Sequence, residues 1–242
     1  MKAFDYRAPE TLDEAITLLA AGGDRARPLA GGTDLIVQLR NGRFELETLV
    51  DIKRLPELNS LSYDSAAGLT IGAAVPVYRV YEDHEISAAY PGLIDAVARI
   101  GGIAVQGRAT IGGNLCNSSP SGDSIPAMIV LAAICKIAGP AGIREIPVEE
   151  FCTGPGRNVL GRGELLVSLR FPLPPPRSGA HYLRFIPRNE MDVAVVGVGA
   201  AVVLSDDLSK ITAARIALGA VAPTPLFVEA AGACLVGIPV SE

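Results

Sequence analysis

The segment that most constrains the fold is a proline run, Pro172-Leu173-Pro174-Pro175-Pro176. Proline has no backbone N–H to donate to a sheet, and its fixed φ favours a stiff, extended connection. The run therefore predicts a boundary between two domains. We expect a first domain over residues 1–175, with subdomains of about 1–56 and 57–175, and a smaller second domain over residues 177–242.

The first domain alternates between helical and strand-like patterns. Thr11-Leu12-Asp13-Glu14 matches a capping box, and the apolar residues that follow at helical spacing end at Gly22-Gly23, so we expect a helix between them. Further helices are expected over residues 34–40, 78–84 and 91–100, and strands over 48–52, 69–75 and 165–171. The apolar segment 123–138 fits either a helix or a strand.

The second domain reads as three strands followed by a helix. The strands are expected over residues 181–186, 193–204 and 211–219, and the helix after Pro225. These elements predict a small α+β unit with a three-stranded antiparallel sheet. Little sequence remains to cover that sheet, so we expect either another chain to cover it or the native protein to be longer.

Composition excludes several classes of function. The chain has 21 Lys and Arg against 26 Asp and Glu, which does not favour binding of nucleic acid or an anionic membrane. The longest apolar stretches, residues 125–135 and 193–204, are too short to span a bilayer, and the N-terminus lacks a secretory signal, so we expect a cytoplasmic protein without a membrane span. Four scattered cysteines and two histidines predict no metal site in this chain.

Two glycine segments carry the strongest functional signal: Leu29-Ala30-Gly31-Gly32-Thr33-Asp34-Leu35 and Thr110-Ile111-Gly112-Gly113-Asn114. Paired glycines let the backbone approach a ligand closely and expose consecutive N–H groups to a phosphate. Neither segment is a P-loop or a GxGxxG motif. Together they suggest a diphosphate-containing ligand held from two sides, while a tight turn at each glycine pair remains an alternative.

A third motif follows the second glycine segment. In Ser119-Pro120-Ser121-Gly122-Asp123, the aspartate lies nine residues after Asn114. With these three motifs, and with Arg188–Ala194 and Arg215–Pro225 further on, the sequence resembles the FAD-binding medium subunits of the molybdenum hydroxylases, the group of xanthine dehydrogenase, aerobic carbon monoxide dehydrogenase and 4-hydroxybenzoyl-CoA reductase. The resemblance implies a PCMH-type FAD-binding domain of two subdomains followed by the α+β domain. By comparison with the family, we expect this α+β domain to lack a closing helical segment.

The resemblance also implies a set of FAD-binding residues. Backbone amides of residues 30–34 and 110–114 would hold the diphosphate, and Asp123 the ribityl or diphosphate region. Ile100 would lie against the flavin ring, Leu160 near the adenine or the ring system, and Arg184 beside a reduced, anionic flavin. The full set of expected cofactor-binding residues is Leu29, Ala30, Gly31, Gly32, Thr33, Asp34, Leu35, Ile100, Thr110, Ile111, Gly112, Gly113, Asn114, Ser119, Asp123, Leu160 and Arg184.

Four of these residues also have a structural interpretation. Without the resemblance, core packing is the commoner role for residues such as Ile100 and Leu160. Asp123 fits a helix N-cap, and Arg184 fits a solvated or paired surface charge. No residue is expected to be catalytic toward an organic substrate.

The resemblance implies electron transfer as the function. Iron–sulfur clusters of a small subunit would deliver electrons to FAD, and NAD, quinone or oxygen would accept them, while a molybdopterin large subunit would hydroxylate the substrate. Two alternatives remain open: a stand-alone FAD-dependent oxidoreductase on the same fold, and a nucleotide-binding module without turnover.

Overall fold

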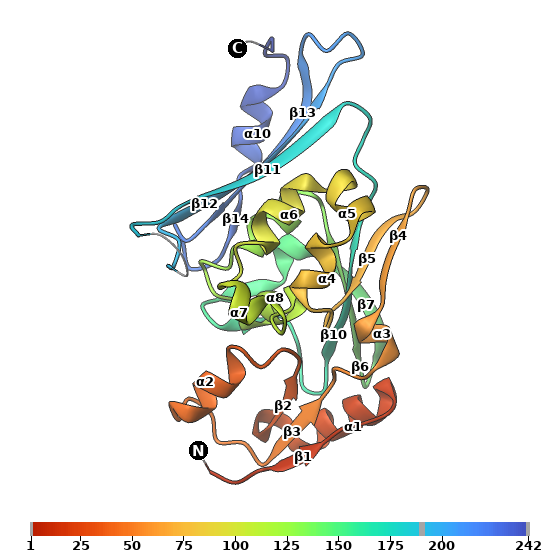
Figure 1. The fold of residues 1–242 in the computed structure, drawn as a ribbon, viewed down its shortest axis with the longest axis vertical. Helices are drawn as coiled ribbons and strands as arrows, with labels where there is room; N and C mark the ends of the chain where they lie inside the picture. The colour runs from red at the N-terminus through yellow and green to blue at the C-terminus, as the bar shows by residue number, and fades with distance from the viewer. Residues whose placement is uncertain (1, 189–191, 241–242) are drawn as a thin grey trace.

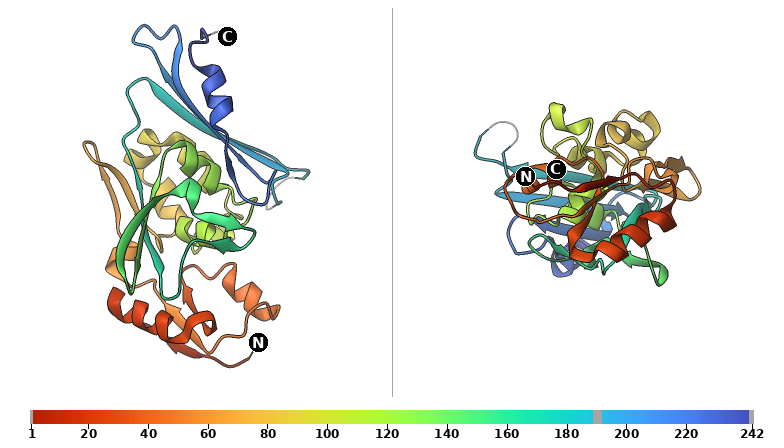
Figure 2. Two further views of the ribbon diagram at one scale, coloured as in Figure 1. Left: turned by 180° about the vertical axis from the view of Figure 1, so that it is seen from behind. Right: turned by 90° about the horizontal axis from the view of Figure 1, so that it is seen from below.

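The computed structural model describes residues 2–188 and 192–240. Its elements form three units that follow one another along the long axis of the molecule (Figure 1). The N-terminal helices and strands occupy one end, a larger sheet with several short helices lies in the middle, and the C-terminal sheet occupies the other end (Figures 1 and 2). Asn189, Glu190 and Met191, from the motif that begins at Arg188, lie outside the described residues.

The N-terminal unit is a small parallel sheet with the strand order β1-β3-β2. Its elements are β1 (Asp5–Arg7), α1 (Leu12–Gly22), a 3-10 turn (Gly23–Arg25), β2 (Ala26–Leu29), α2 (Leu35–Arg40) and β3 (Thr48–Asp51). The predicted first helix is confirmed, because Thr11 Oγ1 accepts from the Glu14 amide at 3.2 Å as an N-cap. The Glu14 carboxylate accepts from the Glu10 amide, one residue before the position of an ideal capping box.

The middle unit contains a five-stranded antiparallel sheet with the order β4-β5-β10-β6-β7. Its strands are β4 (Leu61–Asp64), β5 (Gly68–Gly72), β6 (Ile134–Gly139), β7 (Gly142–Pro147) and β10 (Leu165–Phe171), with a separate hairpin of β8 (Cys152–Gly154) and β9 (Arg157–Asn158). Its helices are α3 (Pro56–Asn59), α4 (Val77–Tyr81), α5 (His84–Ala89), α6 (Pro91–Val97), α7 (Ile103–Gln106), α8 (Ile111–Asn117), α9 (Ser124–Val130) and the 3-10 turn Val148–Glu150.

Three sequence expectations need correction in this unit. The segment 78–84 is not one helix, because Asp83 caps a second one by accepting from the amides of Glu85 and Ile86 at 3.0 Å. The segment 123–138 contains both a helix and a strand, with Ala132 at φ 53° between them. The second glycine segment is the first turn of α8 rather than an open loop.

The C-terminal unit has the antiparallel order β11-β12-β13-β14. Its elements are β11 (Ser178–Phe185), β12 (Val196–Leu204), β13 (Ile211–Gly219), β14 (Leu226–Phe227) and α10 (Glu229–Leu235). The three predicted strands are confirmed, and the two-residue β14 adds a fourth strand that the sequence did not predict. One face packs on α9, where a Cβ at Gly199 would stand 2.6 Å from the Pro126 carbonyl oxygen.

A shared hydrophobic cluster joins the N-terminal and middle units. Ala15, Leu19 and Val50 from the first unit pack with Leu165 and Val167 of β10 in the same cluster. The N-terminal and middle units are therefore packed against each other, and Leu19 and Leu165 of this cluster also line the space between the units. No helix in the described part of the chain is long and apolar enough to cross a membrane.

Candidate functional site

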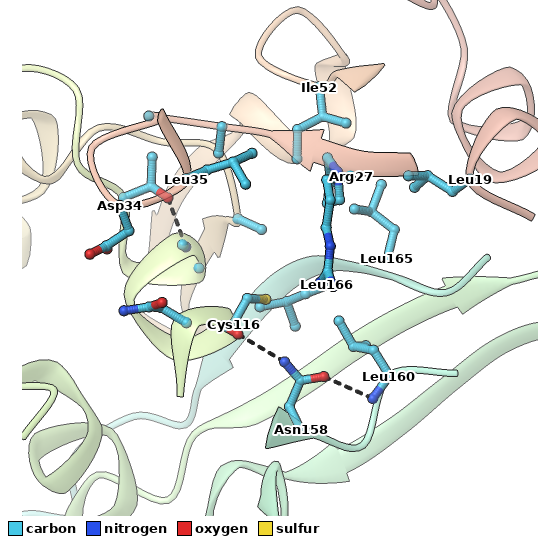
Figure 3. A pocket seen from close by; sticks show the side chains of 18 of the residues that line it. Leu19, Arg27, Asp34, Leu35, Ile52, Cys116, Asn158, Leu160, Leu165 and Leu166 are labelled. Carbon is cyan, nitrogen blue, oxygen red and sulfur yellow. Dashed lines mark hydrogen bonds between the residues drawn. The ribbon is translucent and has the colours of Figure 1, made fainter. Parts of the chain in front are cut away.

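A cavity of about 540 Å³ lies between the N-terminal and middle units (Figure 3). Its volume is within the range of small-molecule and cofactor sites, about 300–1,000 Å³. Both glycine segments line it, although they are far apart in the sequence. The expected site residues that line the cavity are Ala30, Gly31, Gly32, Thr33, Asp34, Leu35, Ile100, Thr110, Gly112, Gly113, Asn114 and Leu160.

The first glycine segment depends on the absence of side chains. A Cβ on Gly31 would stand 2.0 Å from the carbonyl oxygen of Arg108 and 2.7 Å from its carbonyl carbon, both backbone atoms of the chain that enters the second segment. The Arg108 Nε in turn donates to the Gly31 carbonyl at 3.1 Å. Gly32 has φ +79°, in the left-handed region that favours glycine. Only glycine at position 31 lets the two segments come this close.

The second glycine segment is built by packing and by capping. A Cβ on Gly112 would stand 2.5 Å from the Ala73 carbonyl oxygen, so this glycine seats α8 against the chain that follows β5. Thr110 Oγ1 accepts from the Gly113 amide at 2.8 Å. The amide of Asn114 donates to the Thr110 carbonyl at 2.9 Å. These bonds use two of the amides that were expected to face a ligand.

Several backbone amides of residues that line the cavity are unused within the described part of the chain. The amides of residues 31–35 and of Gly112 donate no hydrogen bond to any atom of residues 2–188 or 192–240. An array of unused N–H groups from two directions is what a phosphate-bearing ligand requires. The geometry therefore fits a diphosphate cradle, with the first segment supplying most of the donors.

The remaining five expected site residues do not line the cavity. Leu29 and Ile111 are buried beneath the two glycine segments. The Ser119 hydroxyl lies 3.1 Å from that of Ser121. Asp123 and Arg184 form an ion pair at 2.8 Å, with side chains only 11% and 10% exposed.

The Asp123 carboxylate is surrounded by partners from the C-terminal sheet. Besides Arg184, the Tyr182 hydroxyl donates to it at 2.7 Å. Burial raises the pKa of Asp123, and the bonds from Tyr182 and Arg184 act against that rise. The carboxylate makes no N-cap bond to α9. Its neighbour Ser124 donates to Asn114 Oδ1 at 2.7 Å, which connects this ion pair to the wall of the cavity.

Sequence reasoning missed the polar contacts that cross the cavity. Gln38 Nε2 of α2 donates to Asn117 Oδ1 of α8 at 2.9 Å. Arg162 Nε donates to the Ala20 carbonyl of α1 at 2.8 Å. Each pair joins residues that are at least 79 positions apart, so no local motif could reveal it.

The loop that carries Leu160 is held by a residue that sequence reasoning also missed. Asn158 Nδ2 donates to the Cys116 carbonyl at 2.9 Å, and Asn158 Oδ1 accepts from the Leu160 amide at 3.1 Å (Figure 3). Burial raises the pKa of the Cys116 thiol to about 12, so at neutral pH it is an un-ionised wall of the cavity. Leu160 is thereby positioned against α8.

A bidentate ion pair supports the same loop from outside. Arg144 donates to both oxygens of Glu164 at 2.7 Å and to the Val159 carbonyl at 3.1 Å. The Arg144 guanidinium lowers the pKa of the Glu164 carboxyl. This pair fixes the wall of the cavity between Val159 and Glu164.

Comparison with known proteins identifies the family. Residues 2–174 match the family described as the FAD binding domain in molybdopterin dehydrogenase, and residues 181–242 match the CO dehydrogenase flavoprotein C-terminal domain. The chain belongs to the FAD-binding subunits of molybdopterin dehydrogenases. The predicted family, the α+β fold class and FAD as cofactor are confirmed, and the chain is a subunit of an oxidoreductase.

Two curated relatives and one solved structure show the extent of the match. The xanthine dehydrogenase FAD-binding subunit of Escherichia coli O157:H7 is 35% identical over 91% of this chain and 75% of its own length. The carbon monoxide dehydrogenase medium chain of Afipia carboxidovorans is 33% identical over 97% of this chain and 80% of its own. The structure of carbon monoxide dehydrogenase from Hydrogenophaga pseudoflava superposes with a TM-score of 0.93 at 31% identity, covering 100% of this chain and 83% of that one.

Proposed function

We propose that this FAD-binding subunit carries electrons from the iron–sulfur clusters of a small partner subunit, through FAD, to an acceptor such as NAD, quinone or oxygen. The observation that carries the proposal is the convergence of both glycine segments on one cavity. Family membership supports the proposal, because a relative of this chain is the medium chain of carbon monoxide dehydrogenase, and a medium chain is one component of a larger enzyme. Hydroxylation of the substrate would belong to a molybdopterin large subunit.

FAD, when bound, supplies the electron-transfer chemistry, and the protein supplies binding, orientation and shielding. The unused amides of residues 31–35 and of Gly112 would bind the diphosphate. Ile100 and Leu160, which both line the cavity, would give apolar contact to the two ring systems. We assign the FAD-binding role to residues 1–175 and a supporting role to the C-terminal unit.

Contacts across the cavity orient the cofactor and exclude water. The bonds from Gln38 to Asn117 and from Arg162 to Ala20 join the N-terminal unit to the middle unit. Asp123 and Arg184 neutralise one another in this structure, so their contact with FAD stays a prediction, as does that of Ser119. The cytoplasmic location also stays a prediction.

The test is purification of the chain, first alone and then from its native host with its partners. We expect flavin absorbance bands at one FAD per chain, and co-purification with one iron–sulfur protein and one molybdenum protein. A colourless chain that cannot be loaded with FAD would refute the function altogether. A flavin that is reduced directly by an organic substrate, without the other two proteins, would refute the electron relay.

A further inference from the structure

Arg27 is a residue of the cavity wall with a buried side-chain donor that has no hydrogen-bond partner among the described residues. It lies on β2 just before the first glycine segment, and its side chain stands inside the cavity between Leu35 and Leu165 (Figure 3). Its Nε is buried and has no hydrogen-bond partner among the described residues. Its guanidinium carbon lies 4.3 Å from the centroid of the Phe44 ring. The stacking leaves the edge of the guanidinium, with its donors, for another group.

A guanidinium with a buried N–H that has no acceptor is energetically unfavourable in the wall of a cavity. An arginine side chain remains charged in proteins, and a buried donor without an acceptor loses its hydration without compensation. Burial lowers the pKa of Arg27, and the nearby charge of Arg43 lowers it further, whereas Asp24 raises it. No carboxylate in the described part of the chain forms an ion pair with Arg27.

A second cation strengthens the local charge. Arg43 also lines the cavity, and its guanidinium carbon lies 5.5 Å from the same Phe44 ring. It reaches the opposite wall, where its Nη2 lies 2.5 Å from the position that a Cβ on Gly156 would take. Asp24 and Asp34 line the cavity as well, and burial raises the pKa of Asp34. Two cations on one aromatic ring face a cavity that also offers backbone amides.

We propose that Arg27 is the ion-pair partner of the FAD diphosphate, with its buried Nε donating to a phosphate oxygen. The glycine segments contribute only neutral N–H groups, so a cation in the same cavity wall would add a charge-assisted hydrogen bond, which is stronger than a neutral one. Among the described residues of the cavity wall, Arg27 combines a permanent charge, burial and an unused donor. The proposal rests on the FAD site proposed above and adds the group that neutralises its ligand.

The test compares ligands that differ in phosphate. Apoprotein is titrated with FAD, ADP and adenosine, for the unsubstituted chain and for Arg27→Met, Arg27→Lys and Arg40→Met. Arg40 does not line the cavity, so its variant makes the same change of charge and is the matched control. Charge-assisted hydrogen bonds contribute enough that we expect Arg27→Met to weaken FAD and ADP binding by about 10- to 100-fold. Adenosine binding should not change, and Arg27→Lys should recover part of the loss.

Thermal unfolding of the apoprotein separates a binding role from a structural one. If Arg27 is an uncompensated cation, the apoprotein of Arg27→Met is at least as stable as the unsubstituted apoprotein, and only the stabilisation by FAD is reduced. Equal losses for ADP and adenosine, unchanged FAD binding, or an apoprotein that is destabilised in parallel with its FAD affinity would each overturn the proposal. Failure of the unsubstituted chain to bind FAD would instead refute the FAD site itself.

Discussion

Substitution of Gly31 by alanine adds one methyl group at the point where the two glycine segments touch. The new Cβ would stand 2.0 Å from the Arg108 carbonyl oxygen, whereas ordinary contacts begin at 3.4 Å. The obstructing atoms are backbone, so a side-chain rotation cannot relieve the contact. The two segments must therefore separate by about 1.4 Å, and the amides of residues 31–35 move away from that of Gly112.

The expected magnitude follows from the cost of overpacking. Inserting a methyl group into a closely packed contact costs about 1–3 kcal/mol of stability. Ala109 and Ile111 next to the contact belong to the large hydrophobic cluster of the middle unit, and a loss of this size is smaller than the stability of a typical domain, so the chain should stay folded. FAD needs both segments at once, and the loss of a similar free energy in binding corresponds to about a 10- to 100-fold weaker Kd.

The assay is FAD titration by quenching of flavin fluorescence, with the melting temperature of the apoprotein recorded in parallel. Gly107→Ala is the matched control, because a Cβ at Gly107 meets no atom within 4 Å and its φ of −65° is accessible to alanine. Gly107→Ala should bind FAD like the unsubstituted chain. A Gly31→Ala chain that is folded and binds FAD with unchanged affinity would refute the reasoning about the close approach.

Two further predictions concern the walls of the cavity. We expect Gly32→Val and Gly113→Val to abolish FAD binding while the chain stays folded. Gly32 has φ +79°, which valine rarely adopts, and the branched side chain at position 113 would displace the Thr110 cap. Flavin absorbance and far-UV circular dichroism of the purified variants measure binding and folding, and flavin retained in both variants would contradict the diphosphate cradle. The pKa of Glu164 is lowered in the folded state, so its pair with Arg144 stabilises the protein above the unfolded pKa of about 4.3 and is lost as pH falls through the folded value. Unfolding titrations between pH 7 and 3 should show this loss of stability. In Glu164→Gln the pH-dependent change in the free energy of unfolding should be smaller by about 1 kcal/mol or less, because Arg144 is partly exposed. Identical pH profiles of stability for the variant and the unsubstituted chain would refute the role assigned to this ion pair.

Local patterns predicted those elements that local interactions specify. The helix after Thr11 has its own cap, and β10 and β13 alternate or run as apolar segments bounded by turn residues. The segment 123–138 remained ambiguous because its apolar residues are buried in both a helix and a strand. The change between them occurs at Ala132, whose positive φ no propensity would have predicted.

Contacts between distant residues limited the prediction of the site. The glycine motifs located one wall each, but the requirement for Gly31 arises from Arg108, which lies 77 positions away. Asp123 and Arg184 were expected at the cofactor, and their mutual ion pair across 61 positions was not predictable from either motif. Arg27 is adjacent to the first motif, yet its significance depends on burial and on the missing acceptor for its Nε among the described residues.

The central claim is that FAD lies between the two glycine segments, and hydrogen–deuterium exchange of the chain with and without FAD tests it most directly. The amides of residues 31–35 and of Gly112 have no hydrogen-bond acceptor in the described structure, so they should exchange quickly in the apoprotein. We predict that FAD slows exchange in both segments together and leaves β12 and β13 unchanged. Protection that is absent from either segment, or that appears only in the C-terminal sheet, would contradict the account.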